Sequence, residues 1–312
     1  MRRTVIAVAT LSFVFVAVVI SSAAWRMDPS PATGADFIAR VEPVNPWTHL
    51  RSNQSAEQFQ FAITTDRTGS PRPGVFEHSV TVLNMLQPEF VISVGDLIQG
   101  NANADSTRKL WAEFDGHVRR LEMPFFYLPG NHDIGNKVSD SLWGDLYGRR
   151  YYHFRYKDVL FLMLNSEETP RTATGFISSE QLKYVEQALR DNPNVRWTIV
   201  AVHKPLWTYA DVEKSNWLEV ERLLKGRPHT VVAGHKHRYE RFERNGSVYY
   251  MFATTGGSSK LRGLPFGEFD HIVWVTMKKD GPRFANILLD GVHPEKLDTN
   301  VMAAPTKKTA PK

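Results

Sequence analysis

The sequence of 312 residues contains no cysteine. A disulfide framework therefore cannot support the fold, although the chain tolerates an oxidising compartment. Stability must come from a hydrophobic core, and the length is sufficient for one large α/β domain or two small ones. The sequence also shows no internal repeat.

The body of the chain lacks an excess of charge of either sign. The formal net charge is +5, and residues 1–30 together with 305–312 account for all of it, because they contain six Lys or Arg and one Asp. The stretch between these ends is neutral. Composition therefore gives no support for a basic surface that binds nucleic acid.

Only one long apolar run is present, from Thr4 to Ile20. Arg2 and Arg3 precede it and small residues follow at 21–24, which is the pattern of an export signal. The run is nearly long enough to span a bilayer, so residues 1–24 are either a cleaved signal peptide or an N-terminal membrane anchor. In both cases we expect an exported protein on the periplasmic or extracellular side, tethered to the membrane if the segment is retained.

The rest of the chain divides by composition into three parts. Residues 25–57 contain four prolines without periodicity and are expected to form a linker. Residues 58–298 alternate apolar runs with helical patterns, which predicts a folded α/β domain. Residues 299–312 are expected to be a disordered basic tail.

The order of expected elements in this domain starts with a βαβαβ pattern, which implies largely parallel pairing. The first strands and helices are expected at 59–63, 75–86, 90–94, 107–121 and 125–128. They are followed by a hairpin at 151–156 and 159–164, a helix behind a capping box of Ser178 and Gln181, strands at 197–202 and 230–233, a hairpin across Asn245-Gly246, and a last pair at 271–277 and 285–289.

Side chains that bind metals follow the expected carboxyl ends of several strands. They are Asp66, Asp96, Asn131, His203 and His235, with His237 two residues further on. Loops converge at that edge of an open α/β sheet, so residues remote in sequence meet there. Carboxylate, amide and imidazole ligands together suit two divalent or trivalent ions of the Mn, Fe or Zn type better than calcium.

The motifs resemble the signature of the calcineurin-like metallophosphoesterases, a superfamily that includes purple acid phosphatases and serine/threonine phosphatases. The residues that carry the resemblance are Asp66, Gly95-Asp96, Gly130-Asn131-His132-Asp133, His203 and Gly234-His235-Lys236-His237. The resemblance covers residues 59–289 and implies a metallophosphoesterase domain of two facing mixed β-sheets flanked by helices.

The resemblance also implies roles for these residues. Asp96 is expected to bridge two ions, Asp66 and His237 to hold the first, and Asn131, His203 and His235 to hold the second. A hydroxide held between the ions would then attack phosphorus, and His132 is expected to be the catalytic residue that protonates the leaving group or stabilises the transition state. Asn131 is also expected to contact substrate, and Asp133 to orient its loop. Gly130 and Gly234 are expected to allow tight turns, and the Gly-His-Lys-His segment to be extended so that both imidazoles project the same way.

The first motif departs from the family pattern. Most members carry Asp-x-His, but Thr68 stands in place of the histidine, and the tyrosine that purple acid phosphatases use instead is Gln99 here. We therefore expect the first ion to bind more weakly, with water, Thr68 or Gln99 filling the gap. Arg67, no longer beside a ligand histidine, is expected to bind a substrate phosphate.

Three features remain open between a functional and a structural role. His271 is either a substitute ligand or a core residue, and the segment 254–257 is either a phosphate cradle or a glycine-rich turn. Trp207 and Tyr209 either line the substrate mouth or pack in the core.

The sequence thus predicts a metal-dependent hydrolase of phosphate esters, with a phosphomonoesterase favoured. Arg67, Arg72 and Arg262 are the cationic candidates for binding a dianion. The alternatives are a phosphodiesterase acting on a nucleotide or lipid headgroup, and a catalytically weakened metal-binding module.

Overall fold

The computed structural model describes residues 48, 55–168 and 173–292. By its contacts the chain divides into two compact units, residues 1–56 and 57–312, and the fold below is that of the second. The predicted signal or anchor at 1–24, nearly all of the linker at 25–57 and the tail at 299–312 lie outside the described residues. Within the described part, no helix combines the length and apolar character that crossing a membrane requires.

One sheet has five strands in the order β11-β10-β1-β2-β3. Its members are β1 (Phe59–Thr64), β2 (Val91–Ser93), β3 (Phe125–Phe126), β10 (His271–Lys278) and β11 (Gly281–Leu288). Strands β1, β2 and β3 pair in parallel, as the βαβαβ pattern predicts, whereas β10 is antiparallel to both β1 and β11. The sheet is therefore mixed.

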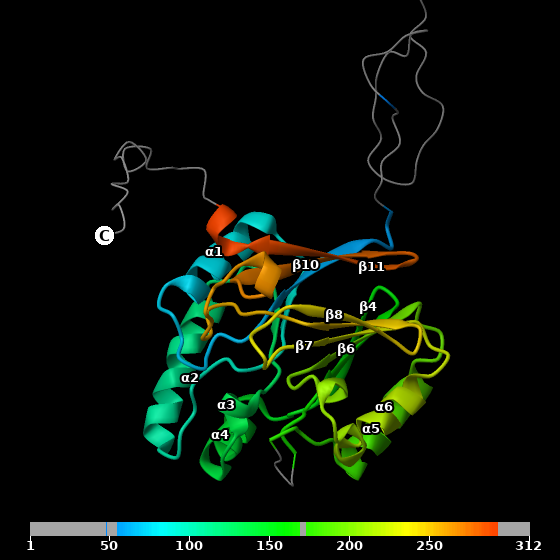
Figure 1. The fold of residues 1–312 in the computed structure, drawn as a ribbon, viewed down its shortest axis with the longest axis horizontal. Coiled ribbons are helices and arrows are strands. Elements are labelled where there is room, and N and C mark those ends of the chain that lie inside the picture. The colour runs from blue at the N-terminus through cyan, green and yellow to red at the C-terminus, as the bar shows by residue number, and fades with distance from the viewer. Residues whose placement is uncertain (1–47, 49–54, 169–172, 293–312) are drawn as a thin grey trace, which may run out of the picture. The chain divides into compact units, whose positions relative to one another are not determined.

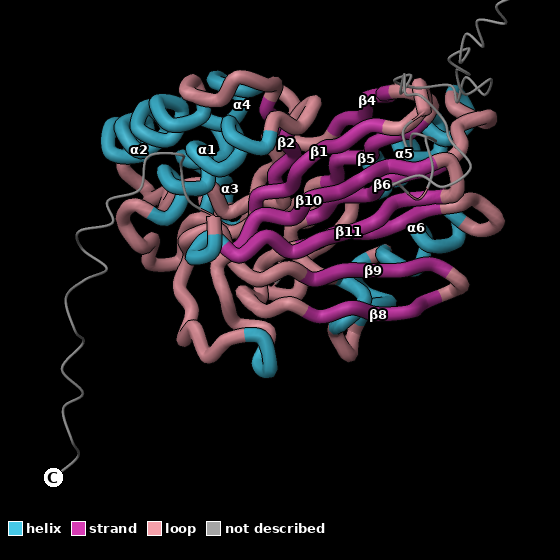
Figure 2. Tube along the Cα trace, turned by 90° about the horizontal axis from the view of Figure 1, so that it is seen from above, coloured by secondary structure: helices cyan, strands magenta, loops and turns pink. Residues whose placement is uncertain are grey.

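The second sheet has six strands in the order β4-β5-β6-β7-β9-β8. Its members are β4 (Tyr152–Tyr156), β5 (Val159–Leu164), β6 (Trp197–Val202), β7 (His229–Ala233), β8 (Glu240–Arg244) and β9 (Ser247–Met251). The four central strands are parallel, and β4 and β8 are antiparallel edges. Figures 1 and 2 show the two sheets stacked face to face, so the predicted pair of facing mixed sheets is confirmed.

Helices cover the outer face of the six-stranded sheet and gather at one end of the sandwich (Figures 1 and 2). They are α1 (Val75–Leu86), α2 (Ala104–Val118), α3 (Asn131–Ile134), α4 (Lys137–Tyr147), α5 (Ser179–Asp191) and α6 (Trp217–Leu224). Helix α1 packs on the outer face of the five-stranded sheet, where Val82 and Leu83 meet Ala62 of β1. Helices α5 and α6 pack on the outer face of the other sheet.

Strand β5 shows how the sequence builds these layers. All six of its residues are buried. Phe161 and Met163 enter the core between the sheets, whereas Leu160 and Leu162 contact the cluster that includes α5 and α6. A central parallel strand buried on both faces reads as a continuous apolar run, which is why this element is readily recognised in the sequence.

Three details of the predicted elements were wrong. Helix α2 begins at Ala104 rather than at 107, because the side chain of Asn103 accepts a hydrogen bond from the Ser106 N–H and caps it. The short helix α3 and the helix α4 were not predicted, although Asn136 caps α4. Ser178 does cap α5, but the Gln181 amide bonds to Asn165 and Glu168 instead of completing a capping box.

Candidate metal centre

The loops after five strands converge on one place, as the sequence predicts. Asp66 lies two residues past β1, Asp96 three past β2, His203 directly after β6 and His235 two past β7, while Asn131 begins α3 shortly after β3. Strands β1, β2 and β3 belong to one parallel set, and β6 and β7 belong to the other. The centre therefore lies where the carboxyl ends of both sheets meet.

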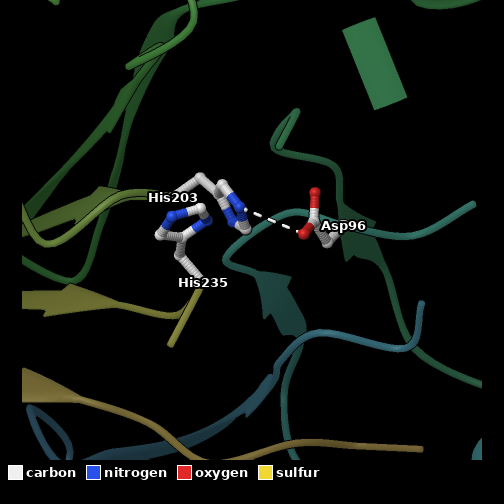
Figure 3. A group of neighbouring side chains, drawn as sticks. All are labelled: Asp96, His203 and His235. Carbon is white, nitrogen blue, oxygen red and sulfur yellow. Dashed lines mark ion pairs between the residues drawn. The ribbon is translucent and has the colours of Figure 1, made fainter. Parts of the chain in front are cut away.

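The side chains form two groups that share one carboxylate. Asp96, His203 and His235 form one group, and Asp66, Asp96 and His237 form the other, with the potential ligand atoms of each group within 4.8 Å of one another. Figure 3 shows Asp96, His203 and His235, with both imidazoles on the side that Asp96 faces. The two groups have the membership that the family resemblance implies for two ions.

Close polar contacts connect the members of each group. His203 Nε2 lies 3.2 Å from Asp96 Oδ2 and 3.1 Å from Asn131 Oδ1, so Asn131 adjoins the group of Asp96, His203 and His235 as expected. His237 Nε2 lies 3.3 Å from Asp66 Oδ1. Both aspartates are essentially buried, at 0% exposure for Asp66 and 1% for Asp96. Such a concentration of buried acceptors is costly unless a cation or proton compensates it.

Backbone contacts fix the tautomers of two of the histidines. His203 Nδ1 lies 2.8 Å from the carbonyl oxygen of Val94, and His237 Nδ1 lies 2.6 Å from that of Ser258. A carbonyl only accepts, so each Nδ1 carries a proton. Each Nε2 then faces the carboxylates, which is the arrangement that protein metal sites use to orient an imidazole ligand.

Three of the proposed ligands have a left-handed backbone. The φ angles are 58° at Asp96, 72° at His235 and 52° at His237. The expected extended conformation of Gly-His-Lys-His was therefore wrong, because the chain turns at both histidines and sends their rings into different groups. A left-handed backbone is uncommon outside glycine and tends to occur at functional sites.

Glycine is required at positions 130 and 234 because a carboxylate oxygen lies too close for a Cβ, and not because the backbone has a positive φ. A Cβ on Gly130 would lie 2.3 Å from Asp96 Oδ1, and a Cβ on Gly234 would lie 2.1 Å from Asp66 Oδ2. Neither residue has a positive φ. Each glycine thus leaves room for one carboxylate of the centre.

The residues fit a pair of cations. Asp66 Oδ2 is buried and has no hydrogen-bond partner, which is the condition expected of an oxygen that binds a metal. Burial acts to raise the pKa of Asp96, but the neighbouring His203 imidazole outweighs it and lowers that pKa to about 2. Burial lowers the pKa of His235 to about 2, so its ring is neutral and able to bind a metal. Carboxylate, imidazole and amide oxygen together suit Mn, Fe or Zn.

The position of the missing histidine has another use in this chain. The Thr68 hydroxyl donates to Gln99 Oε1 at 3.2 Å, and Gln99 Nε2 lies 2.7 Å from His132 Nδ1. Because an amide N–H only donates, His132 Nδ1 accepts and the proton is on Nε2. That Nε2 lies 3.9 Å from Asp96 Oδ2, so this chain of contacts points a proton donor at the shared carboxylate.

Asp133 orients its loop, as the sequence predicts. The carboxylate accepts hydrogen bonds from the backbone N–H groups of Leu97, Ile98 and Gly130, at 2.8 to 2.9 Å. It is fully buried. Asp133 therefore connects the loop of Asp96 to the loop of Asn131 and His132.

The three arginines expected to bind substrate are engaged elsewhere. Arg67 forms an ion pair with Glu113 of α2 at 2.7 Å and lies over the rings of Phe76 and Phe114. Arg72 pairs with Asp270, and Arg262 pairs with Glu268. The cations that line the cavity are instead Lys236 and Lys260.

The cavity beside the ligand groups has a volume of about 570 Å³. Its lining includes side chains from the centre and from the segment after β9. These residues are Gly69, Asp96, His132, His235, Lys236, His237, Ser258, Ser259, Lys260 and Glu268. Sequence reasoning missed residues 258–260, because no metal-binding residue type or family motif marks them.

The open alternatives are decided by contacts. The N–H groups of Thr255 and Gly257 donate to the carbonyl of Asp66, so segment 254–257 is a turn that supports the first motif. His271 is buried and bonded to Asn286, and it belongs to neither ligand group. Trp207 packs in the core, whereas the ring of Tyr209 lies 4.3 Å from the ammonium of Lys236.

Comparisons with known proteins agree with this geometry. The family model for calcineurin-like phosphoesterases matches residues 48–239. A 3',5'-cyclic-nucleotide phosphodiesterase of Nostoc sp. is 24% identical over 234 residues, covering 73% of this chain and 83% of that protein. The probable purple acid phosphatase 20 of Arabidopsis thaliana is 28% identical over 69% of this chain, which spans only 55% of that relative. The solved purple acid phosphatase of yellow lupin seeds has the same fold, with a TM-score of 0.56 at 14% identity over 75% of this chain and 52% of that one.

Proposed function

The chain belongs to the calcineurin-like phosphoesterase family and is a phosphoric ester hydrolase, and we propose that it is a phosphomonoesterase with a dinuclear metal centre. One observation carries the proposal: the buried Asp96 carboxylate belongs to two ligand groups at once. A carboxylate shared in this way is what a bridged pair of ions requires.

Asp66, Asp96 and His237 would hold the first ion, and Asp96, Asn131, His203 and His235 the second. When bound, two such ions supply an acidified water and neutralise charge on the phosphoryl oxygens. The identity of the metal is proposed only as the Mn, Fe or Zn class, from the mixture of oxygen and nitrogen ligands.

The protein's own groups provide the remaining chemistry. His132 lines the cavity, and its Nε2 proton faces the shared Asp96. Its Nε2–H is placed to donate a hydrogen bond to the oxygen that leaves phosphorus and so to stabilise the transition state, and Gln99 keeps the ring in the required tautomer. Asn131 is held close to His203 and serves as ligand and substrate contact in this scheme.

Two lysines favour a monoester. Lys236 and Lys260 both line the cavity, and a monoester dianion benefits from cationic contacts beyond those of the ions. The similarity to the Nostoc phosphodiesterase, which extends over 83% of that protein, supports a second candidate that cleaves diesters. Hydrolysis of p-nitrophenyl phosphate and of bis(p-nitrophenyl) phosphate by the purified protein distinguishes them, and faster turnover of the diester would reverse our choice.

The decisive experiment compares three variants for bound metal and turnover. We expect Asp96→Asn to lose both, since it disrupts both ligand groups. His132→Ala is expected to keep its metal and lose turnover by roughly 10²- to 10³-fold, the usual contribution of a donor that stabilises the transition state. His153→Ala is the matched control, because His153 contacts Tyr184 and belongs to neither group. Full activity in the first two variants would disprove the proposal.

We also propose that the protein is exported, on the strength of the segment at 1–24. Fractionation of cells that express the full chain would locate it. N-terminal sequencing of the recovered protein would show either a cleaved leader or a retained membrane anchor. Recovery of the intact chain in the cytoplasm would contradict export.

A further inference from the structure

An unusual set of exposed apolar side chains lies beside the cavity. Among the residues that the structure describes, six large apolar side chains are exposed, and three of them fall within residues 261–266. Leu261 is 47% exposed, Leu264 62% and Phe266 48%. The other three, Met85, Leu146 and Leu218, lie singly on α1, α4 and α6. We call residues 258–268 the rim loop.

The rim loop is held in one shape by its own hydrogen bonds. The backbones of Gly263 and Glu268 bond to each other in both directions, at 2.9 and 3.3 Å. A 3-10 turn, η3 (Leu264–Phe266), closes between them. At the base, Gly267 O accepts the Tyr239 N–H at 2.8 Å. The apolar side chains are therefore displayed by a preformed turn.

The loop is continuous with the proposed active site. Ser258, Ser259 and Lys260 line the same cavity as Asp96 and His132. The carbonyl of Ser258 also holds the ring of His237. A surface that contacts the tip of the loop therefore comes close to the mouth of the metal centre.

Cationic side chains surround the apolar tip. Lys260 is exposed, and the Arg262 guanidinium lies 4.4 Å from the centre of the Phe266 ring. Arg238 adjoins Gly267 and is 58% exposed. The carboxylates nearby include Glu268, which pairs with Arg262, and Glu240, 3.9 Å from Arg238. Asp270 and Asp290 line a neighbouring pocket with Leu261, and Asp270 pairs with Arg72. With Lys236 of the cavity included, the side chains around the tip and the cavity mouth comprise four cations, of which Lys236 and Lys260 have no ion pair with these carboxylates among the described contacts.

We propose that the rim loop docks on an anionic lipid surface and brings the metal cavity against it. Exposed apolar groups in a cluster mark an interaction site, and apolar tips flanked by Lys and Arg fit the boundary between acyl chains and anionic headgroups. If the apolar run at 4–20 is retained as an anchor, residues 21–58 join it to β1 and reach roughly 130 Å when extended, which would keep the loop within reach of the same membrane. This inference goes beyond the proposed hydrolysis and does not depend on it.

The absence of cysteine allows a direct test in the full chain. Leu264→Cys provides a single site for an environment-sensitive fluorophore, and Leu218→Cys on α6 provides the matched control. We expect phosphatidylcholine vesicles containing phosphatidylglycerol to shift the emission of the label at 264 to the blue and to raise its intensity about twofold or more, as for a probe that enters the interface. The shift should weaken at high salt and with phosphatidylcholine alone.

The control separates docking from other effects. Both labelled proteins have the same N-terminal segment, so insertion of that segment alone changes both equally or neither. An unchanged label at 264, or equal shifts at 264 and 218, would refute the proposal. A shift that needs no vesicles and grows with protein concentration, together with a doubled mass in solution, would instead identify a second copy as the occupant and equally refute it.

A second variant tests the apolar contacts without touching the cavity. Leu264→Ser combined with Phe266→Ser should abolish the vesicle response of a label at Leu261→Cys. Hydrolysis of soluble p-nitrophenyl phosphate should stay unchanged, because neither side chain lines the cavity. Because docking is measured by fluorescence and hydrolysis by a separate assay, the docking proposal can be supported or refuted even if the protein has no phosphatase activity.

Discussion

The two ligand groups of the centre differ in how many strong ligands the protein supplies. The group of Asp96, His203 and His235 contains two imidazoles and is joined by the Asn131 oxygen. The group of Asp66, Asp96 and His237 contains one imidazole, and Thr68 stands where the family usually provides another. The same fold therefore contains one site with four protein ligands and one site with three, which we call the depleted site.

The difference is not simply a loss. Thr68 is fully buried, and its hydroxyl bonds to Gln99, which in turn bonds to His132. A position that serves metal binding in relatives is here part of the chain of contacts that orients the proposed acid. We infer that Thr68 lowers the affinity for the first ion, because it adds no strong ligand, and that it helps to orient His132 through Gln99.

Among the changes that compare the two groups, the largest effect should come from removing an imidazole from one group at a time. We expect His203→Ala to lower turnover by about 10³-fold, because an ion contributes several kcal/mol of transition-state stabilisation. His237→Ala should remove the first ion but cost less if that ion is already weakly held. Metal content and turnover of both variants test this. Equal losses at both positions would show that the two sites are equivalent.

Glycine variants make the same comparison without deleting a ligand. Gly130→Ala forces a Cβ onto the shared Asp96 and should reduce metal at both sites, with turnover down by about 10²-fold. Gly234→Ala forces one onto Asp66 and should affect the first site only. Gly291→Ala is the control, since its Cβ would meet nothing within 4 Å. Isothermal titration with Mn²⁺ resolves the sites, and loss of both in Gly234→Ala would contradict the division.

Much of this arrangement could be predicted from the sequence, because its signals are local. Apolar runs gave the strands, and ligand types placed after them gave Asp66, Asp96, His203 and His235. The end of a parallel strand is a position that sequence pattern and topology determine together.

The parts that failed depend on contacts between distant segments. Arg67 could be assigned to a phosphate only while Glu113 of α2 was unseen, and the two residues lie 46 positions apart. The turns at His235 and His237 have no pattern in the sequence, because their left-handed backbone is imposed by the surrounding packing. The rim loop was missed because three exposed apolar residues resemble core residues in a sequence.

Restoring the family ligand should reduce the contrast between the sites. We expect Thr68→His to tighten binding of the first ion by about tenfold, within the range of changes in affinity produced by altering metal-site residues. Thr68→Val is the control, since it removes the hydroxyl without adding a ligand. Competition against a metal-sensitive dye measures both, and unchanged affinity in Thr68→His would mean that position 68 does not face the first ion.

The smallest effect is expected from Gln99, which connects Thr68 to His132 and orients its ring. Gln99→Ala should leave metal content unchanged and lower turnover by about fivefold, because His132 keeps its place on α3 but loses the partner that selects its tautomer.

Gln99→Glu should instead favour a proton on Nδ1, because a carboxylate accepts where the amide donates. The pH profile of turnover should then shift to higher pH, since a negative partner raises the pKa of an imidazole. A profile identical to that of the native protein in Gln99→Glu would show that Gln99 does not position the acid.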